Sequence, residues 1–178
     1  MPKMRRQTLQ REFENLLTGH SGVVFKVAAI YTRRHADRED LAQEICTQAW
    51  RSFGRFDADK GKFSTWLYRV ALNVGISWAR KHPWALEDRH EPIDDQHLQH
   101  IGGGNSIDDP DGRIAALYEH IGSLDPLNRA LMMLVLDERS HAEMADILGI
   151  STSNVATKIN RIKQKLRVQM TAAQPIGA

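Results

Sequence analysis

The run from Ser151 to Val168 is rich in hydroxyl, amide and basic side chains and contains no Asp or Glu. Arg and Asn pair bidentately with the edges of guanine and adenine, and basic side chains also hold DNA phosphates. The chemistry that this run offers is therefore hydrogen bonding to DNA. The candidates for base or near-base contact are Ser153, Asn154, Thr157, Lys158 and Arg161, and those for backbone contact are Lys163, Lys165 and Arg167.

These side chains need a helix that can enter the major groove, and local signals predict one. Gly149 favours a left-handed turn after a helix that starts near Ser140, and Ser151 is a good N-cap for the next helix. Apolar residues on that second helix recur at helical spacing: Val155, Ile159, Ile162 and Leu166. The pattern predicts a helix-turn-helix that reads DNA with its second helix. The alternative is an ordinary helical hairpin with a solvated basic face.

A second group of residues combines aromatic rings with positive charge. The stretch from Lys60 to Lys81 carries five basic residues and no acid. Together with Phe56, its aromatic residues exceed what we expect a core to require: Phe56, Phe63, Trp66, Tyr68 and Trp78. Aromatic platforms beside cations suit single-stranded DNA, whose bases stack on the rings. The alternative is that Phe63 and Trp66 belong to the core or to a helix start.

Composition bounds the class of protein. The chain has 178 residues, a formal net charge of +2 and a single cysteine, so no internal disulfide can form and a reducing compartment is expected. Neither a signal peptide nor a membrane span is expected. The histidines at 90, 97 and 100 lack a ligand framework, and no nucleophile–base pair stands out. We therefore expect no metal, no cofactor and no enzymatic activity.

The periodicity predicts helices throughout, hence an all-α fold. Gly19 and Gly22 should divide the first helical stretch, and Ser64 or Thr65 should cap the helix that Pro83 stops. Residues 84–112 are acidic and rich in Gly and Asp, as in a flexible linker. The expected organisation is two small helical domains, residues 1–83 and 113–170, joined by the linker 84–112 and followed by a tail, 171–178.

Two blocks of the sequence resemble an extracytoplasmic-function (ECF) RNA polymerase sigma factor of the sigma-70 family. DREDLAQEICTQAWRSFGRFDADKGKFSTWLYRVALNVGISWARK resembles conserved region 2, a helical bundle. LDPLNRALMMLVLDERSHAEMADILGISTSNVATKINRIKQKLR resembles region 4, a helix-turn-helix domain. The resemblance implies a protein that directs core RNA polymerase to specific promoters and assists strand opening at the −10 element.

The resemblance also implies residue roles. The acidic helix would dock on the β′ clamp helices of the polymerase through Asp37, Glu39, Asp40, Gln43 and Glu44. A loop and the following helix would hold the melted −10 element through Lys60, Lys62, Phe63, Ser64, Thr65, Trp66 and Asn73, with Arg80 and Lys81 at the basic helix end. The region 4 helix would read the −35 element with Ser153, Asn154, Thr157, Lys158, Arg161, Lys163 and Lys165.

Further partners follow from the same resemblance. The helix around residues 127–136 would dock on the β flap, and an anti-sigma factor is compatible with the class. The expected location is the bacterial cytoplasm, at the nucleoid through polymerase. The alternative function is a conventional dimeric helix-turn-helix regulator whose N-terminal half dimerises. That alternative predicts a twofold operator and DNA binding without polymerase.

Overall fold

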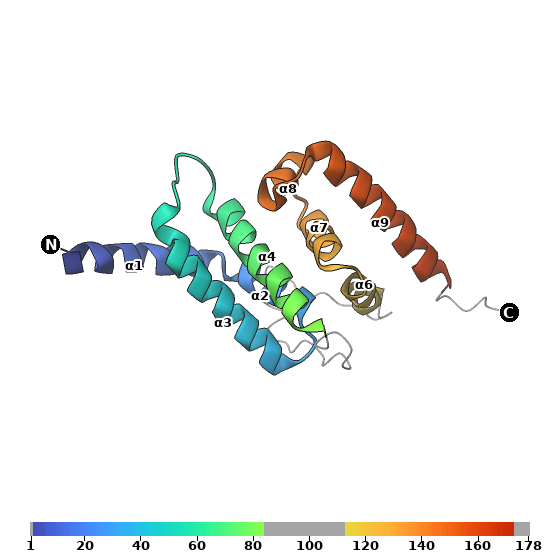
Figure 1. Ribbon diagram of the computed structural model, residues 1–178, viewed down its shortest axis with the longest axis horizontal. Coiled ribbons are helices and arrows are strands. Elements are labelled where there is room, and N and C mark those ends of the chain that lie inside the picture. The colour runs from blue at the N-terminus through green and yellow to red at the C-terminus, as the bar shows by residue number, and fades with distance from the viewer. Residues whose placement is uncertain (1, 84–112, 173–178) are drawn as a thin grey trace. The chain divides into compact units, whose positions relative to one another are not determined.

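The computed structural model describes residues 2–83 and 113–172, and every regular element within these ranges is a helix (Figure 1). The all-α prediction is therefore confirmed. The chain divides into two compact units, Met1–Asp108 and Asp109–Ala178, here called unit 1 and unit 2. The predicted linker, residues 84–112, and the end of the tail lie outside the described residues.

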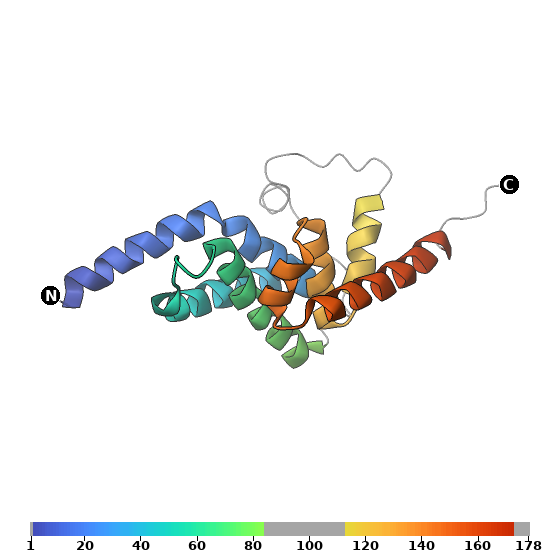
Figure 2. The ribbon, with the colours of Figure 1, turned by 90° about the horizontal axis from the view of Figure 1, so that it is seen from above.

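The described residues of unit 1 form four α-helices and one short 3-10 helix. These are α1 (Pro2–Gly19), α2 (Ser21–Tyr31), α3 (His35–Ser52), the 3-10 helix η1 (Phe53–Arg55) and α4 (Phe63–Lys81). Helices α2, α3 and α4 pack against one another and bury an apolar core that includes Val27, Leu41, Ile45, Leu67 and Ala71. Helix α1 extends away from this bundle toward the N-terminus (Figure 2).

Two details of unit 1 differ from the sequence prediction. Gly22 lies inside α2, so the chain breaks once, between Gly19 and Ser21. The N-cap of α4 is Lys62, without a side-chain cap, and Ser64 and Thr65 lie in the first turn. The predicted Ser or Thr cap is therefore wrong. The helix starts earlier because the ring of Phe63 is buried among other aromatic rings.

Gly75 lets α4 approach α2 closely. A Cβ built at Gly75 would lie 2.5 Å from Cδ2 of Tyr31, whose side chain is fully buried. Only a residue without a side chain fits this crossing. The position therefore fixes how closely α4, which carries many of the candidate −10 contacts, packs on the bundle.

Unit 2 contains α6 (Arg113–Gly122), α7 (Pro126–Leu136), α8 (His141–Leu148) and α9 (Thr152–Ala172). Its helices begin and end at residues with capping contacts. Asp125 accepts a hydrogen bond from the backbone N of Asn128 at 3.1 Å. Ser140 caps α8, and Gly149 ends it in the left-handed conformation with φ of 67°. The predicted helix-turn-helix is present.

A buried arginine joins the first two helices of unit 2. The side chain of Arg129 is buried, and its Nε donates a hydrogen bond to the carbonyl of Leu124 at 2.6 Å. Leu124 lies in the turn between α6 and α7. The bond therefore ties the turn to α7. The sequence does not predict this contact, because arginine is usually a surface residue.

Candidate nucleic-acid interface

One face of α9 is apolar and buried, and the other is polar and open. Val155, Ile159, Ile162 and Leu166 are all buried, as their spacing predicts. The N-terminus of α9 is fixed by Ser151, whose Oγ accepts a hydrogen bond from the backbone N of Asn154 at 3.2 Å. The outward positions are exposed, with Lys158 half-buried: Ser153, Asn154, Thr157, Arg161 and Lys165. Because a helix turns 100° per residue, these positions form one stripe.

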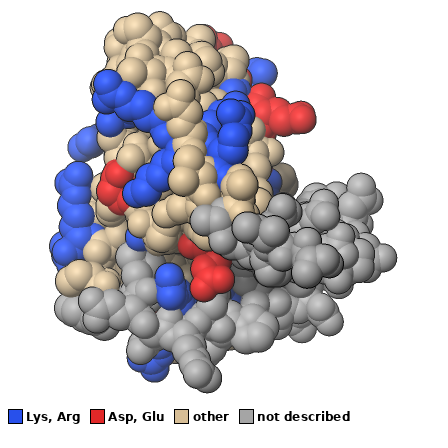
Figure 3. All heavy atoms as spheres, turned by 90° about the vertical axis from the view of Figure 1, so that its right-hand side faces the viewer, with Lys and Arg blue, Asp and Glu red and all other residues tan. Residues whose placement is uncertain are grey.

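The polar side of α9 is positively charged. Figure 3 shows several Lys and Arg side chains on the upper part of the face that it presents, with few Asp or Glu among them. In α9 itself the basic residues are opposed by no acid between Thr152 and Ala172. Such a surface attracts the phosphates of DNA over a range of about 10 Å at moderate salt.

Lys163 stands apart from the stripe. Two positions along the helix from Arg161, it is rotated by about 200° and lines a groove of unit 2 together with Arg167. The structure thus brings the other six predicted −35 residues together and places Lys163 on a different side of α9.

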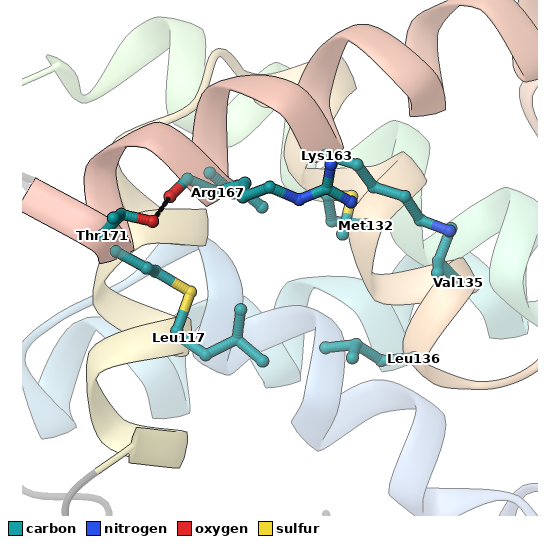
Figure 4. A pocket seen from close by; sticks show the side chains of 9 residues that line it. Leu117, Met132, Val135, Leu136, Lys163, Arg167 and Thr171 are labelled. Atoms are coloured by element: carbon teal, nitrogen blue, oxygen red, sulfur yellow. Dashed lines mark hydrogen bonds between the residues drawn. The ribbon is translucent and has the colours of Figure 1, made fainter.

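The groove of unit 2 is apolar with a basic rim (Figure 4). Its volume is about 480 Å³, and it lies among α6, α7 and α9. Its lining is mostly apolar: Leu117, Met132, Val135, Leu136, Leu166 and Met170. Leu136 is 42% exposed. The groove therefore offers apolar surface with Lys163 and Arg167 beside it.

In unit 1 the predicted loop, between η1 and α4, begins and ends at a group of packed aromatic rings. We call this group the aromatic cluster: Phe13, Trp50, Phe53, Phe56, Phe63 and Trp66. Phe56 stacks on Phe53 with centroids 5.9 Å apart, and it lies 5.4 Å from Trp66. Phe63 closes the other end of the loop, 5.5 Å from Phe56. The loop is therefore anchored at both ends by the same cluster.

The loop between these anchors is polar and open. Lys60 is strongly exposed, and its Nζ lies 3.1 Å from a carboxylate oxygen of Asp57. Asp57 also accepts a hydrogen bond from the backbone N of Asp59 at 3.1 Å. Lys62 is exposed at the start of α4. These contacts shape the loop around residues 57–60 while leaving its cations available to a polyanion.

The aromatic rings of unit 1 are less available than the sequence suggests. Phe63, Tyr68 and Trp78 are buried, whereas Phe56 and Trp66 are half-buried. The expectation that these rings exceed the needs of the core is therefore wrong for the three buried ones. Phe63 in particular faces other rings, so it supports the loop and does not offer a face to a base.

Helix α4 carries a second stripe of predicted contacts. Trp66, Asn73 and Arg80 are spaced by seven residues, nearly two turns, so they fall on one side of the helix. Asn73 also lines a polar groove of about 360 Å³ between α3 and α4, together with Glu44 and Gln48. Ser64 and Thr65 lie near the loop in the first turn, and Lys81 ends the helix.

The acidic residues of α3 lie outside its buried face. Arg38, Leu41, Ala42, Ile45 and Ala49 are buried, whereas Glu39, Asp40, Gln43 and Glu44 are exposed and Asp37 is half-buried. A carboxylate of Glu39 lies 3.8 Å from the ring of His35. Apart from Gln43 the exposed set is acidic, so this side of α3 carries negative charge.

Several residues of these sites escaped the sequence analysis. Phe13 and Phe53 complete the aromatic cluster, Gln48 and Ser52 line the polar groove, and Leu117 and Met170 line the apolar one. The density of aromatic residues between positions 50 and 66 was the available signal for the cluster. No sequence signal marks the grooves, because each joins residues from separate helices.

The described residues carry neither a metal-ion cluster of three or more His, Cys, Asp or Glu nor a helix long and apolar enough to span a membrane. The histidines at 90, 97 and 100 lie outside the described residues. Burial raises the pKa of the Cys46 thiol, which favours its protonated form.

These features define a two-unit helical protein with a helix-turn-helix that is suited to DNA. Comparison with known families gives the class. The sigma-70 region 2 family matches residues 16–85, and the sigma-70 region 4 family matches residues 114–166. The two matches fall in unit 1 and unit 2 respectively.

Individual relatives agree with the family matches. The chain is 27% identical to the RNA polymerase sigma factor CnrH of Cupriavidus metallidurans over 92% of this chain and 88% of the relative. It is 31% identical to the ECF sigma factor SigW of Bacillus subtilis over 75% of each chain. The fold is similar to that of RpoE in its complex with the anti-sigma factor NepR from Bartonella quintana, with a TM-score of 0.67, 18% identity and coverage of 92% and 99%.

The chain belongs to the ECF class of sigma-70 family RNA polymerase sigma factors. It is thus an initiation factor that directs RNA polymerase to promoters, and the family is a non-catalytic one. The alternative of a conventional dimeric regulator is not favoured, because both sigma regions are present in order.

Proposed function

We propose that the two units read two elements of one promoter while both hold the polymerase. The stripe on α9 reads the −35 element as duplex, and the loop 54–62 with α4 holds the melted −10 element. The observation that carries the proposal is the acid-free, exposed stripe of α9 on a capped helix-turn-helix. Two weak sites on one chain gain affinity through effective concentration.

The reading of the −10 element rests on chemistry that the loop offers. Extruding a base from the stack costs a few kcal/mol, which a shaped pocket and nearby cations must offset. Lys60 and Lys62 supply charge beside the half-buried rings of Phe56 and Trp66. Asn73 and Arg80 continue the same surface along α4. Phe63 enters this proposal as a support of the loop.

Reconstitution with core RNA polymerase, followed by transcription from a genomic DNA library, tests the proposal. We expect specific initiation only when this chain is added, at sites that share two elements at a fixed spacing. Specific binding of the free chain to a twofold operator would instead favour a dimeric regulator. The promoters recovered supply the DNA for the experiments below.

We further propose that the acidic surface of α3 meets the β′ clamp helices. The variant Asp40→Ala with Glu44→Ala should weaken binding to core polymerase roughly tenfold, since charges at an interface mainly set recognition and encounter. The matched control is Glu12→Ala with Glu14→Ala, which removes two exposed acids from α1. Equal binding by both double variants would contradict this assignment.

The apolar groove of unit 2 is our proposed site for the β flap. Leu136→Lys adds a positive charge to a groove whose rim is already basic, and it should abolish measurable binding of the flap, because a charge without an opposite partner is costly to bury. Val168→Lys is the control, since Val168 is 70% exposed and does not line the groove. Loss of binding in both variants would point to charge alone.

The remaining assignments follow from the class. We propose that the chain binds without catalytic activity of its own and works in the bacterial cytoplasm, at the nucleoid through polymerase. An anti-sigma factor is a further proposed partner, because the solved relative RpoE was captured with one.

A further inference from the structure

Helix α1 is anchored to unit 1 through one buried ring. Among residues 6–19, whose side chains are described, Phe13 alone is buried, with 6% of its surface exposed. Its ring lies 5.3 Å from that of Trp50 and 5.1 Å from that of Phe53. Phe13 also precedes residue 16, where the match to the sigma-70 region 2 family begins. The family match therefore assigns it no role.

The ring contacts continue from Phe13 into the loop. Phe53 stacks on Phe56 at an interplanar angle of 17°, and the backbone N of Phe56 donates a hydrogen bond to the carbonyl of Phe53 at 2.9 Å. Phe56 in turn touches Phe63 and Trp66. Phe53 precedes the loop and Phe63 follows it, and their rings are in contact. A shift of Phe53 would therefore change the packing at both ends of the loop.

The end of α1 supports the other side of the loop. His20, between α1 and α2, packs edge-on against Phe63 with centroids 5.2 Å apart. Its Nδ1 lies 2.8 Å from the carbonyl oxygen of Leu16 in α1. Phe13 of α1 therefore contacts Phe53 before the loop, and His20, which follows α1, contacts Phe63 after it.

We propose that α1 braces the −10 loop and that Phe13 is a positioning residue for base capture, although its ring lies in the core. The inference rests on the proposed function of the loop. The physical reason is preorganisation: a loop already held in its bound shape loses less conformational freedom when it engages a ligand. Phe13 acts through Phe53 and Phe56 and need not contact DNA.

The first test is hydrogen exchange in the free full-length chain. Phe13→Leu keeps an apolar side chain but removes the ring, and Leu9→Ala, one turn earlier and 37% exposed, is the matched control. We expect the backbone amides of Phe56 and Lys60 to exchange roughly tenfold faster in Phe13→Leu, because local opening of the loop becomes easier. Amides in the middle of α2 and α4 should keep their rates.

Three outcomes of this exchange test would overturn either the brace or the specific role of Phe13 in it. Unchanged rates at Phe56 and Lys60 in folded Phe13→Leu would show that the loop does not depend on the ring. An equal rise across α2, α3 and α4 would show that Phe13 supports the whole unit and not the loop. Faster exchange in Leu9→Ala as well would assign the effect to α1 in general.

The second test uses the holoenzyme on recovered promoter DNA with single abasic sites in the non-template strand of the −10 element. In the wild type, loss of the captured base should shorten the life of the open complex roughly tenfold, the loss expected of one base contact. In Phe13→Leu this penalty should fall to roughly twofold, because a loosened loop no longer captures the base. A purely structural role would leave the penalty unchanged.

The failures of the two proposals are distinguishable. If the wild type shows no penalty at any abasic position, base capture by the loop is wrong, whereas the exchange test still judges the brace. If the wild type shows the penalty and Phe13→Leu retains it in full, the loop function stands and the positioning role of Phe13 is refuted.

Discussion

In unit 2 the candidate DNA contacts project from a helix whose start is fixed by a side-chain cap, whereas in unit 1 they surround a loop held by rings from α1, α3 and α4. Unit 2 orients α9 with signals local in sequence: Ser140, Gly149 and Ser151 lie within a dozen residues. Unit 1 depends on contacts between residues far apart in the sequence, such as Phe13 with Phe53 and His20 with Phe63. The proposed duplex-reading site is thus specified by local signals, and the proposed single-strand site by tertiary packing.

The comparison predicts that the largest single effect comes from packing in unit 1. Gly75→Ala should destabilise unit 1 by about 3 kcal/mol, because overpacking forces side chains off their preferred rotamers and Tyr31 is fully buried. All four tryptophans precede residue 109, so tryptophan fluorescence during denaturant unfolding reports unit 1 alone.

Gly54→Ala is the control for this variant, because a Cβ at Gly54 meets no atom within 4 Å. It should change the unfolding free energy of unit 1 little. If Gly75→Ala left the fluorescence midpoint at the wild-type value, the close approach of α2 and α4 would not be a constraint on the fold.

The next effect concerns the reading face of unit 2. Arg161→Ala should cost about 1–3 kcal/mol of discrimination between promoters that differ in the −35 element, if Arg161 makes a bidentate base contact. Lys165→Ala, on the same stripe, should weaken all promoters alike and lower the salt dependence of binding. Competition between −35 variants for the holoenzyme measures both. A uniform loss in Arg161→Ala would make it a phosphate contact.

A smaller effect tests whether unit 2 depends on local geometry. Gly149→Ala should destabilise unit 2 by about 1–2 kcal/mol, because a side chain is disfavoured in the left-handed region that this residue occupies. Gly149→Asn should cost less, since Asn tolerates that conformation. Circular dichroism follows the loss of helix, while the tryptophan signal of unit 1 should stay unchanged.

The smallest effect is a pH dependence at the capping box of α8. The backbone N of Ser140 donates a hydrogen bond to the Glu143 carboxylate at 2.9 Å and lowers the pKa of Glu143 below its ordinary value of 4.5, helped by the Ser140 hydroxyl and by Arg139. A carboxylate whose pKa is lower in the folded than in the unfolded state stabilises the fold fully at pH values above its unfolded-state pKa. This stabilisation is lost as the pH falls through the folded-state pKa.

Glu143→Gln isolates this contribution. The wild type should be the more stable protein at neutral pH, and the difference in unfolding free energy should shrink as the pH falls below about 4.5. Helix content during unfolding at several pH values measures it. Because the side chain of Glu143 is partly exposed to water, the effect should be small. A difference that is constant with pH would show that the charge of Glu143 contributes nothing.

Much of unit 2 could be predicted from single residues. Its helix ends are marked by hydrogen bonds that span only a few residues. The residue pairs involved are Asp125 before Pro126, Ser140 before Glu143, and Gly149 before Ser151. The apolar stripe of α9 then fixes which face is open. Lys163 is the exception, because the groove that it lines is formed together with residues of α6 and α7, and the sequence of α9 alone does not predict such a groove.

Unit 1 shows where prediction failed. Phe63, Tyr68 and Trp78 were expected to be surplus to the core, but they are buried. Aromatic residues favour both cores and base stacking, so residue type alone does not separate the two roles. The Ser or Thr cap of α4 was wrong for a related reason: the start of the helix is set by burial of Phe63 and not by a local hydrogen bond.

The sequence by itself determined the helical class, the helix-turn-helix and the residues that can face DNA, because periodicity and capping act over one or two turns. Only the tertiary structure decided which rings are core and which remain near the surface, and that Gly75 must lack a side chain. It also placed the ring of Phe13 against that of Phe53, at the start of the loop that we propose for the −10 element. Those facts depend on contacts between helices, which no local pattern records.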